Sequence, residues 1–293
     1  MTFREKLHAG NFVVTAEIGP PKGTDISRML KNIELLKGKV DAANVTDNQS
    51  AVMRICSLAV STVAVENGLE PIFQMTCRDR NRIGMQSDLL GAYILGIRNV
   101  LCMTGDYVST GDHKNAKPVY DVESVQLLRI VDGLNQGRDM SGNELKGATD
   151  FFPGAVVTPE TDFLEPQLMK FEKKVNAGAQ FFQTQAIYDM EAFKKFMDYA
   201  GKFPVKILAG IVVLKSTGMA NFMNKNVPGI KVPQELIDEL KAAGKEKAVE
   251  AGMDIAARHI RQLKDGSICD GVHIMAIGME DKVPVIMERA GLV

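Results

Sequence analysis

The chain has 293 residues, with 35 basic and 36 acidic side chains that give a net charge of −1, and 45% of its residues are hydrophobic. This balance, without any run of five like charges, argues against a nucleic-acid surface or a polybasic membrane patch, and no apolar run reaches the roughly 18 residues of a membrane span. The four cysteines lie far apart, without Cys-x-x-Cys or zinc spacing, so we expect no metal or iron–sulfur site within the chain.

Short apolar runs and longer stretches of helical spacing alternate along the chain. The apolar runs predict eight strands, over residues 12–18, 41–46, 71–77, 99–105, 151–158, 180–187, 205–214 and 271–277. The stretches between them predict helices over residues 26–37, 53–67, 83–96, 122–137, 164–177, 190–199 and 233–263. Gly68, Gly137 and Gly178 follow three of these helices, which predicts left-handed C-caps.

Continuously apolar strands that alternate with amphipathic helices indicate a parallel sheet buried on both faces. Eight such units favour closure, so we expect one (β/α)8 barrel domain over residues 1–293, with an extra helical segment at about 232–266. An open doubly wound sheet is the alternative, but no Gly-x-Gly-x-x-Gly follows the first strand. The polar stretch 107–119 could be a lid over the site or a surface loop. The first residues contain no apolar leader, so we expect a cytoplasmic protein.

Carboxylates lie where two buried strands end, which in a barrel is the end that carries the chemistry. Glu17 closes an apolar strand, a setting that favours a carboxyl group able to hold and donate a proton. Asp106 directly follows Gly105 after the fourth strand. A backbone-bonded strand end for Glu17 and an Asx turn or helix cap for Asp106 are the structural alternatives.

Three arginines follow the third strand at alternate positions, Arg78, Arg80 and Arg82. Guanidinium groups at a barrel mouth could hold a phosphate or a folate-like carboxylate. The alternative is a salt-bridged loop formed with Asp79 and Asp88.

The remaining polar candidates are amides and scattered histidines. Gln183 and Gln185 end the sixth strand and offer groups that both donate and accept, as a pterin or flavin edge requires. We interpret His273 as a strand residue packed in the barrel wall. Hydrolase and kinase motifs are absent from the sequence.

Taken together, these motifs resemble those of the methylenetetrahydrofolate reductase family, which are flavoprotein (β/α)8 barrels. The resemblance covers nearly the whole chain and is most specific at residues 16–21, 45–48, 76–91, 104–106 and 173–185.

The resemblance implies reduction of 5,10-methylenetetrahydrofolate to 5-methyltetrahydrofolate, with hydride delivered from flavin N5. It implies that Glu17 is the general acid, that Asp106 tunes the flavin and holds folate, that Gln185 binds the pterin, and that Phe222 loosely matches a residue stacking on the folate benzoyl ring. The implied flavin contacts are Thr46, Thr76, Arg78, Asp79, Arg80, Gly105 and Lys174.

FAD is the cofactor expected of this family, but FMN is an alternative because Gly154 and Thr158 stand where bacterial members have a Tyr and a His. Electrons could come from NAD(P)H or from a separate iron–sulfur subunit, and we expect an oligomer. A pterin-dependent methyltransferase barrel and a non-catalytic folate-binding subunit are the alternative functions.

Overall fold

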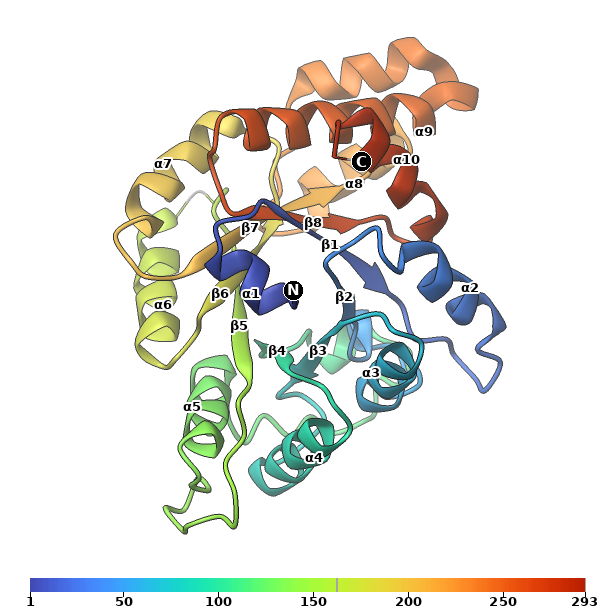
Figure 1. The fold of residues 1–293 in the computed structure, drawn as a ribbon. Helices are drawn as coiled ribbons and strands as arrows, with labels where there is room; N and C mark the ends of the chain where they lie inside the picture. The colour runs from blue at the N-terminus through green and yellow to red at the C-terminus, as the bar shows by residue number, and fades with distance from the viewer. Residues whose placement is uncertain (162, 293) are drawn as a thin grey trace.

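The computed structural model describes residues 1–161 and 163–292, and its centre is a closed barrel of eight parallel strands (Figure 1). The strands follow one another around the barrel in chain order, and β8 pairs with β1 to close it. They are β1 Val13–Ile18, β2 Ala42–Val45, β3 Pro71–Thr76, β4 Asn99–Met103, β5 Phe152–Val157, β6 Phe181–Ala186, β7 Lys206–Val212 and β8 Gly271–Met275. The predicted (β/α)8 fold is therefore confirmed, with every strand within two residues of its predicted ends.

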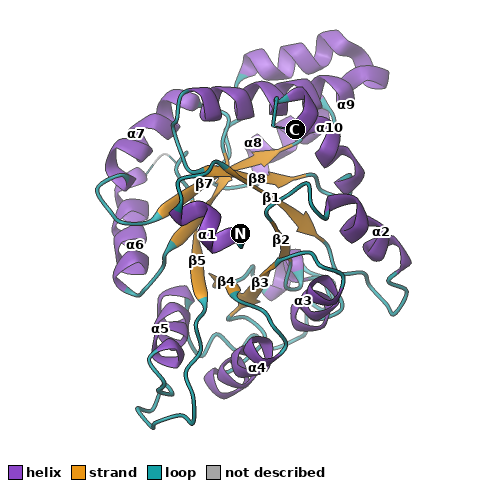
Figure 2. Cartoon of the chain, in the orientation of Figure 1, coloured by secondary structure: helices purple, strands orange, loops and turns teal. Residues whose placement is uncertain are grey.

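Helices form the outer ring of the barrel (Figure 2). The seven predicted helices are present as α2 Ser27–Leu36, α3 Ser57–Glu66, α4 Arg82–Ile94, α5 Ser124–Asn135, α6 Leu164–Asn176, α7 Met190–Ala200 and α9 Gln234–Asp265. Gly68, Gly137 and Gly178 follow three of them with positive φ, as predicted. The sequence did not predict α1 Phe3–His8, α8 Thr217–Asn226 or α10 Val283–Arg289. Three 3₁₀ turns complete the structure, η1 Gln49–Ala51, η2 Val108–Thr110 and η3 Glu280–Lys282.

Helix α1 closes the amino-terminal end of the barrel. Phe3 and Leu7 are completely buried among inward-facing side chains of the strands, and the Phe3 ring lies 5.4 Å from that of Phe181. In Figure 1 the amino terminus lies over the barrel centre. This apolar plug leaves the opposite end, where the carboxyl ends of the strands meet, for a binding site.

Helix α9 is the charged helical segment that extends the minimal barrel, and it bends at Gly244, which has φ 75°. Its buried residues pack partly on α8 and partly on the barrel. None of the described helices has both the length and the apolarity needed to cross a bilayer.

Candidate active site

A cavity of about 480 Å³ opens at the carboxyl ends of the strands. This volume falls within the roughly 300–1,000 Å³ usual for small-molecule and cofactor sites. Seven of the eleven site residues expected from the sequence line it: Glu17, Thr76, Arg78, Gly105, Asp106, Lys174 and Gln185. The barrel thus brings together residues on or just after β1, β3, β4 and β6 and one residue of α6, which are widely separated in the sequence.

Glu17 reaches this cavity because side chains alternate along β1. Ala16 and Ile18 belong to the outer core between strands and helices, so Thr15 and Glu17 point into the barrel. The Glu17 side chain is 13% exposed, which leaves it accessible to a ligand while most of it is out of water. Such a carboxyl group can exchange a proton with a bound substrate.

His273 faces Glu17 from β8, with Nε2 at 3.7 Å from Glu17 Oε1. Its Nδ1 lies 3.0 Å from the hydroxyl of Thr15, which fixes the ring orientation. His273 is thus a buried strand residue, as interpreted from the sequence, and its side chain also lines the cavity, which was not expected. Its apolar neighbours Val272 and Ile274 pack on the outer face of the barrel. This alternation of apolar and polar residues in the sequence indicates that His273 faces the barrel interior.

Amides form the floor of the cavity. Asn44 and Gln183 exchange two hydrogen bonds, Asn44 Nδ2 to Gln183 Oε1 at 2.6 Å and Gln183 Nε2 to Asn44 Oδ1 at 2.9 Å. Gln185 lies two residues further along β6 and therefore on the same side, and its Oε1 accepts the Ala186 amide. Gln183 therefore links β6 to β2 across the interior of the barrel, whereas Gln185 is placed nearer the mouth.

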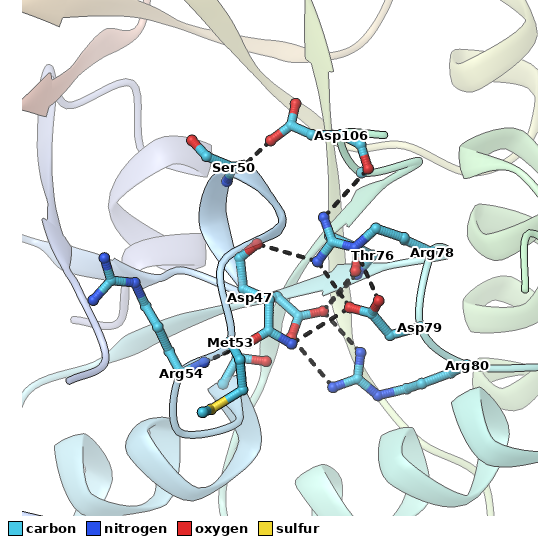
Figure 3. A network of polar contacts seen from close by, with 12 residues as sticks. Asp47, Ser50, Met53, Arg54, Thr76, Arg78, Asp79, Arg80 and Asp106 are labelled. Atoms are coloured by element: carbon cyan, nitrogen blue, oxygen red, sulfur yellow. Dashed lines mark hydrogen bonds and ion pairs between the residues drawn. The ribbon is translucent and has the colours of Figure 1, made fainter. Parts of the chain in front are cut away.

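Asp106 lies just beyond β4, after a turn that requires glycine. Gly105 has φ 91°, and a Cβ there would lie 3.0 Å from Thr76 Cβ. The carboxylate of Asp106 accepts a hydrogen bond from the Ser50 amide at 3.1 Å, and its carbonyl oxygen accepts one from Arg78 Nη1 at 3.4 Å (Figure 3). The same carbonyl oxygen accepts a hydrogen bond from Tyr120 Oη at 2.8 Å. The side chain and the backbone of Asp106 are therefore both held in place.

The arginines behind β3 form ion pairs with carboxylates. Arg78 is 2% exposed and donates to Asp79, and Arg80 donates to Asp47 at 2.8 Å (Figure 3). Arg80 also donates to Asp88 at 2.9 Å. The pairs with Asp79 and Asp88 are those of the salt-bridged loop given above as the alternative, and Asp47 is a further partner of Arg80. Asp47 was not identified from the sequence, yet its side chain is completely buried and also accepts hydrogen bonds from the Thr76 amide and hydroxyl.

Arg80 keeps its positive charge beside Asp47. Burial by itself lowers the pKa of Arg80, but the nearby carboxylates of Asp47 and Asp88 outweigh this effect, and the pKa is raised overall. Of the arginines expected to meet a ligand, only Arg78 lines the cavity. Arg80 and Asp79 lie behind it and hold the loop.

Lys174 brings a positive charge to the β5 side of the cavity. Lys174 belongs to α6, and its Nζ donates to the carbonyl oxygen of Val156 on β5 at 2.6 Å. Burial, followed by the repulsion of Lys170, lowers the pKa of Lys174 to about 8. The group is therefore still mainly cationic at neutral pH and is able to meet a phosphate.

Thr46 and Phe222 do not line the cavity. Thr46 follows β2 and is 2% exposed, and its hydroxyl has no hydrogen-bond partner within the described part of the chain. Phe222 lies on α8 and is 60% exposed. The structure thus separates these two candidates from the group around Glu17.

Comparison with protein families gives one match over nearly the whole chain. The family model described as methylenetetrahydrofolate reductase matches residues 2–291. Methylenetetrahydrofolate reductase 2 of Schizosaccharomyces pombe is 25% identical over 98% of this chain, and 5,10-methylenetetrahydrofolate reductase of Pectobacterium carotovorum is 26% identical over 69%. The matched part is 47% of the yeast protein and 64% of the bacterial protein, so the chain spans about half the length of the yeast relative.

Among solved structures, a Clostridium thermocellum protein that binds two copies of 5-methyl-5,6,7,8-tetrahydrofolic acid has the same fold. The TM-score is 0.67 at 18% sequence identity, with 99% of this chain and 98% of that protein covered.

Proposed function

The chain belongs to the methylenetetrahydrofolate reductase family, and on this premise we propose that it reduces 5,10-methylenetetrahydrofolate to 5-methyltetrahydrofolate at the cavity described above. The observation that carries the proposal is the convergence of Glu17, Asp106 and Gln185 on one cavity at the active end of the barrel. The names of the yeast and bacterial relatives support the reaction, and the methyltetrahydrofolate bound by the Clostridium protein supports the substrate class.

The residues around the cavity fit a flavin. The volume admits a planar ring system, and Lys174 supplies a cation for a phosphate. We assign Thr76, Arg78 and Gly105 to the same cofactor, with Asp79 and Arg80 holding these residues from behind. When bound, a reduced flavin supplies the hydride. FAD and FMN both suit this set of residues.

Glu17 supplies the proton. In its protonated form it gives that proton to the folate nitrogen as the bond between this nitrogen and the methylene carbon breaks, which leaves an iminium carbon as hydride acceptor. The half-buried setting of the carboxyl group suits this role. His273, 3.7 Å away, keeps Glu17 oriented toward the cavity.

Asp106 and Gln185 position the pterin. The Asp106 carboxylate accepts hydrogen bonds from N–H groups and adds negative charge beside the cofactor, and the Gln185 amide both donates and accepts. Holding both reactants in one geometry lowers the entropic part of the barrier.

We propose two possible electron sources, NAD(P)H bound at the same cavity or an iron–sulfur protein that acts as a partner subunit. Turnover of the purified chain with NADH would show that the partner is not required.

The test of this function is an anaerobic single turnover. The protein should purify yellow, bleach on reduction, and regain its absorbance on adding methylenetetrahydrofolate, with one methyltetrahydrofolate formed per flavin. A pterin-dependent methyltransferase or a non-catalytic subunit would show no such recovery.

Substitution of Glu17 tests its assigned role. Glu17→Gln should bind flavin and folate normally but slow flavin reoxidation by roughly 10²–10⁴-fold, the usual contribution of one general acid. Glu144→Gln is the control, because the Glu144 side chain is 82% exposed and does not line the cavity. An unchanged rate in Glu17→Gln would remove Glu17 from this role.

A further inference from the structure

The segment of residues 48–51, which follows β2, has a strained backbone. Asn48, Ser50 and Ala51 have φ angles of 45°, 56° and 57°, in the left-handed region that non-glycine residues seldom adopt. Such strain persists only where the surrounding structure imposes it, and it is concentrated at functional sites. The contacts around this segment show what imposes it.

The loop after β4 holds the segment from one side. The Ser50 amide donates to the Asp106 carboxylate at 3.1 Å, and the Thr110 hydroxyl donates to the Ser50 carbonyl oxygen at 3.4 Å. Gly111 lies so close that a Cβ on it would be 1.8 Å from the Ala51 carbonyl oxygen. The absence of a side chain at Gly111 therefore allows the loop after β4 to pack directly against the backbone of segment 48–51.

The loop after β3, which carries Arg78 and Arg80, holds the segment from the other side. Arg78 Nη2 donates to the Asn48 carbonyl oxygen at 3.1 Å (Figure 3). Within the loop that contains the segment, the Arg54 amide donates to Asn48 Oδ1 at 2.9 Å. Figure 3 shows Ser50 and Arg78 meeting Asp106 from two directions. The strained segment therefore lies between two anchors, and the Ser50 amide joins it to a carboxylate of the cavity.

We propose that segment 48–51 positions Asp106: Gly111 permits the strained backbone of Ser50 and Ala51, and this backbone aims the Ser50 amide at the Asp106 carboxylate. The amide limits the rotation of the carboxylate, so the group is oriented before folate binds. Ser50 is a positioning residue that acts through Asp106. The inference rests on the proposed role of Asp106 in holding folate.

Gly111→Ala tests the proposal without changing any group that touches the ligand. Gly111 has φ −92°, which alanine accepts, so the main effect is the collision of the new methyl group with the Ala51 carbonyl oxygen. The collision displaces Ser50 and breaks its bond to Asp106. With flavin-loaded protein, calorimetric titration of 5-methyltetrahydrofolate should show roughly tenfold or greater weakening, the usual cost of losing a hydrogen bond to a charged group.

Two controls separate this effect from general damage. Gly91→Ala in α4 places a methyl group where no atom lies within 4 Å, and it should leave folate affinity unchanged. Ser50→Gly keeps the amide and suits the positive φ, so it too should keep the affinity. Thermal unfolding of each variant confirms that it is folded. Loss of affinity in Ser50→Gly would overturn the role of the amide.

A double-mutant cycle shows whether the effect passes through Asp106. Asp106→Ala should weaken folate binding, and adding Gly111→Ala should then cost nothing further. Additive losses would overturn the positioning role while leaving the proposed reductase function intact. Normal folate affinity in Asp106→Ala would refute the role of Asp106 itself, and the positioning role with it.

Discussion

The buried lysine of the cavity makes the stability of the protein depend on pH in a predictable way. Lys174 is 5% exposed, and burial lowers its pKa from 10.5 to about 8. The unfolded chain therefore binds more protons than the folded chain at pH values between these two, so the free energy of unfolding rises as pH increases through that window.

The magnitude follows from the difference between the two pKa values. At 1.36 kcal/mol per unit, charging the buried lysine costs about 3 kcal/mol at pH 7, and most of this cost is gone by pH 10. Replacing Lys174 by methionine keeps the length of the side chain and removes the charge. The difference in unfolding free energy between Lys174→Met and the parent protein should therefore shrink by about 2–3 kcal/mol between pH 7 and pH 10.

Urea unfolding of both proteins at the two pH values measures this change, because every other titrating group cancels in the comparison. Lys173→Met is the matched control, since Lys173 lies next to Lys174 on the same helix but is exposed. A stability difference for Lys174→Met that stays constant with pH would refute the burial of a charged lysine at the cavity.

Phe3→Ala should lower the free energy of unfolding by about 3–5 kcal/mol, because it removes the side chain that fills the apolar plug. Folate affinity measured by calorimetry should stay the same, because the site is at the other end of the barrel. A large loss of folate affinity in folded protein would contradict this separation. Arg80→Met should cost about 3 kcal/mol in urea unfolding, because it leaves the Asp47 carboxylate buried without its cation. Arg82→Met, which breaks an exposed pair, should cost less than about 1 kcal/mol, and equal losses in the two variants would argue against a special role for Asp47.

The barrel was predictable from the sequence because each strand is buried on both faces and so forms a continuous apolar run between turn residues. The short helix α1 has only six residues, too few for a periodic pattern, and its position depends on the plug that Phe3 forms in the finished barrel. Helix α8 carries Gly218 and several asparagines, which are weak helix formers, and it is held by packing against α9.

The residues of the site were predictable where chemistry and strand position coincide, as for Glu17 and Asp106. Asp47 was not singled out, and His273 was not expected in the cavity, because their places in the site depend on partners distant in the sequence, Arg80 for Asp47 and Glu17 for His273. The strained backbone at Ser50 has no local signature, since serine is not a residue that prefers positive φ, and contacts with Arg78 and with the loop after β4 hold it.

The most direct measurement is a crystal structure of the protein with flavin and 5-methyltetrahydrofolate bound. We expect both molecules in the cavity at the carboxyl ends of the strands, with the Glu17 carboxyl group within hydrogen-bond reach of a folate nitrogen, at about 2.6–3.2 Å or through one water. Folate bound elsewhere, or a Glu17 side chain directed away from it, would contradict the proposed reaction.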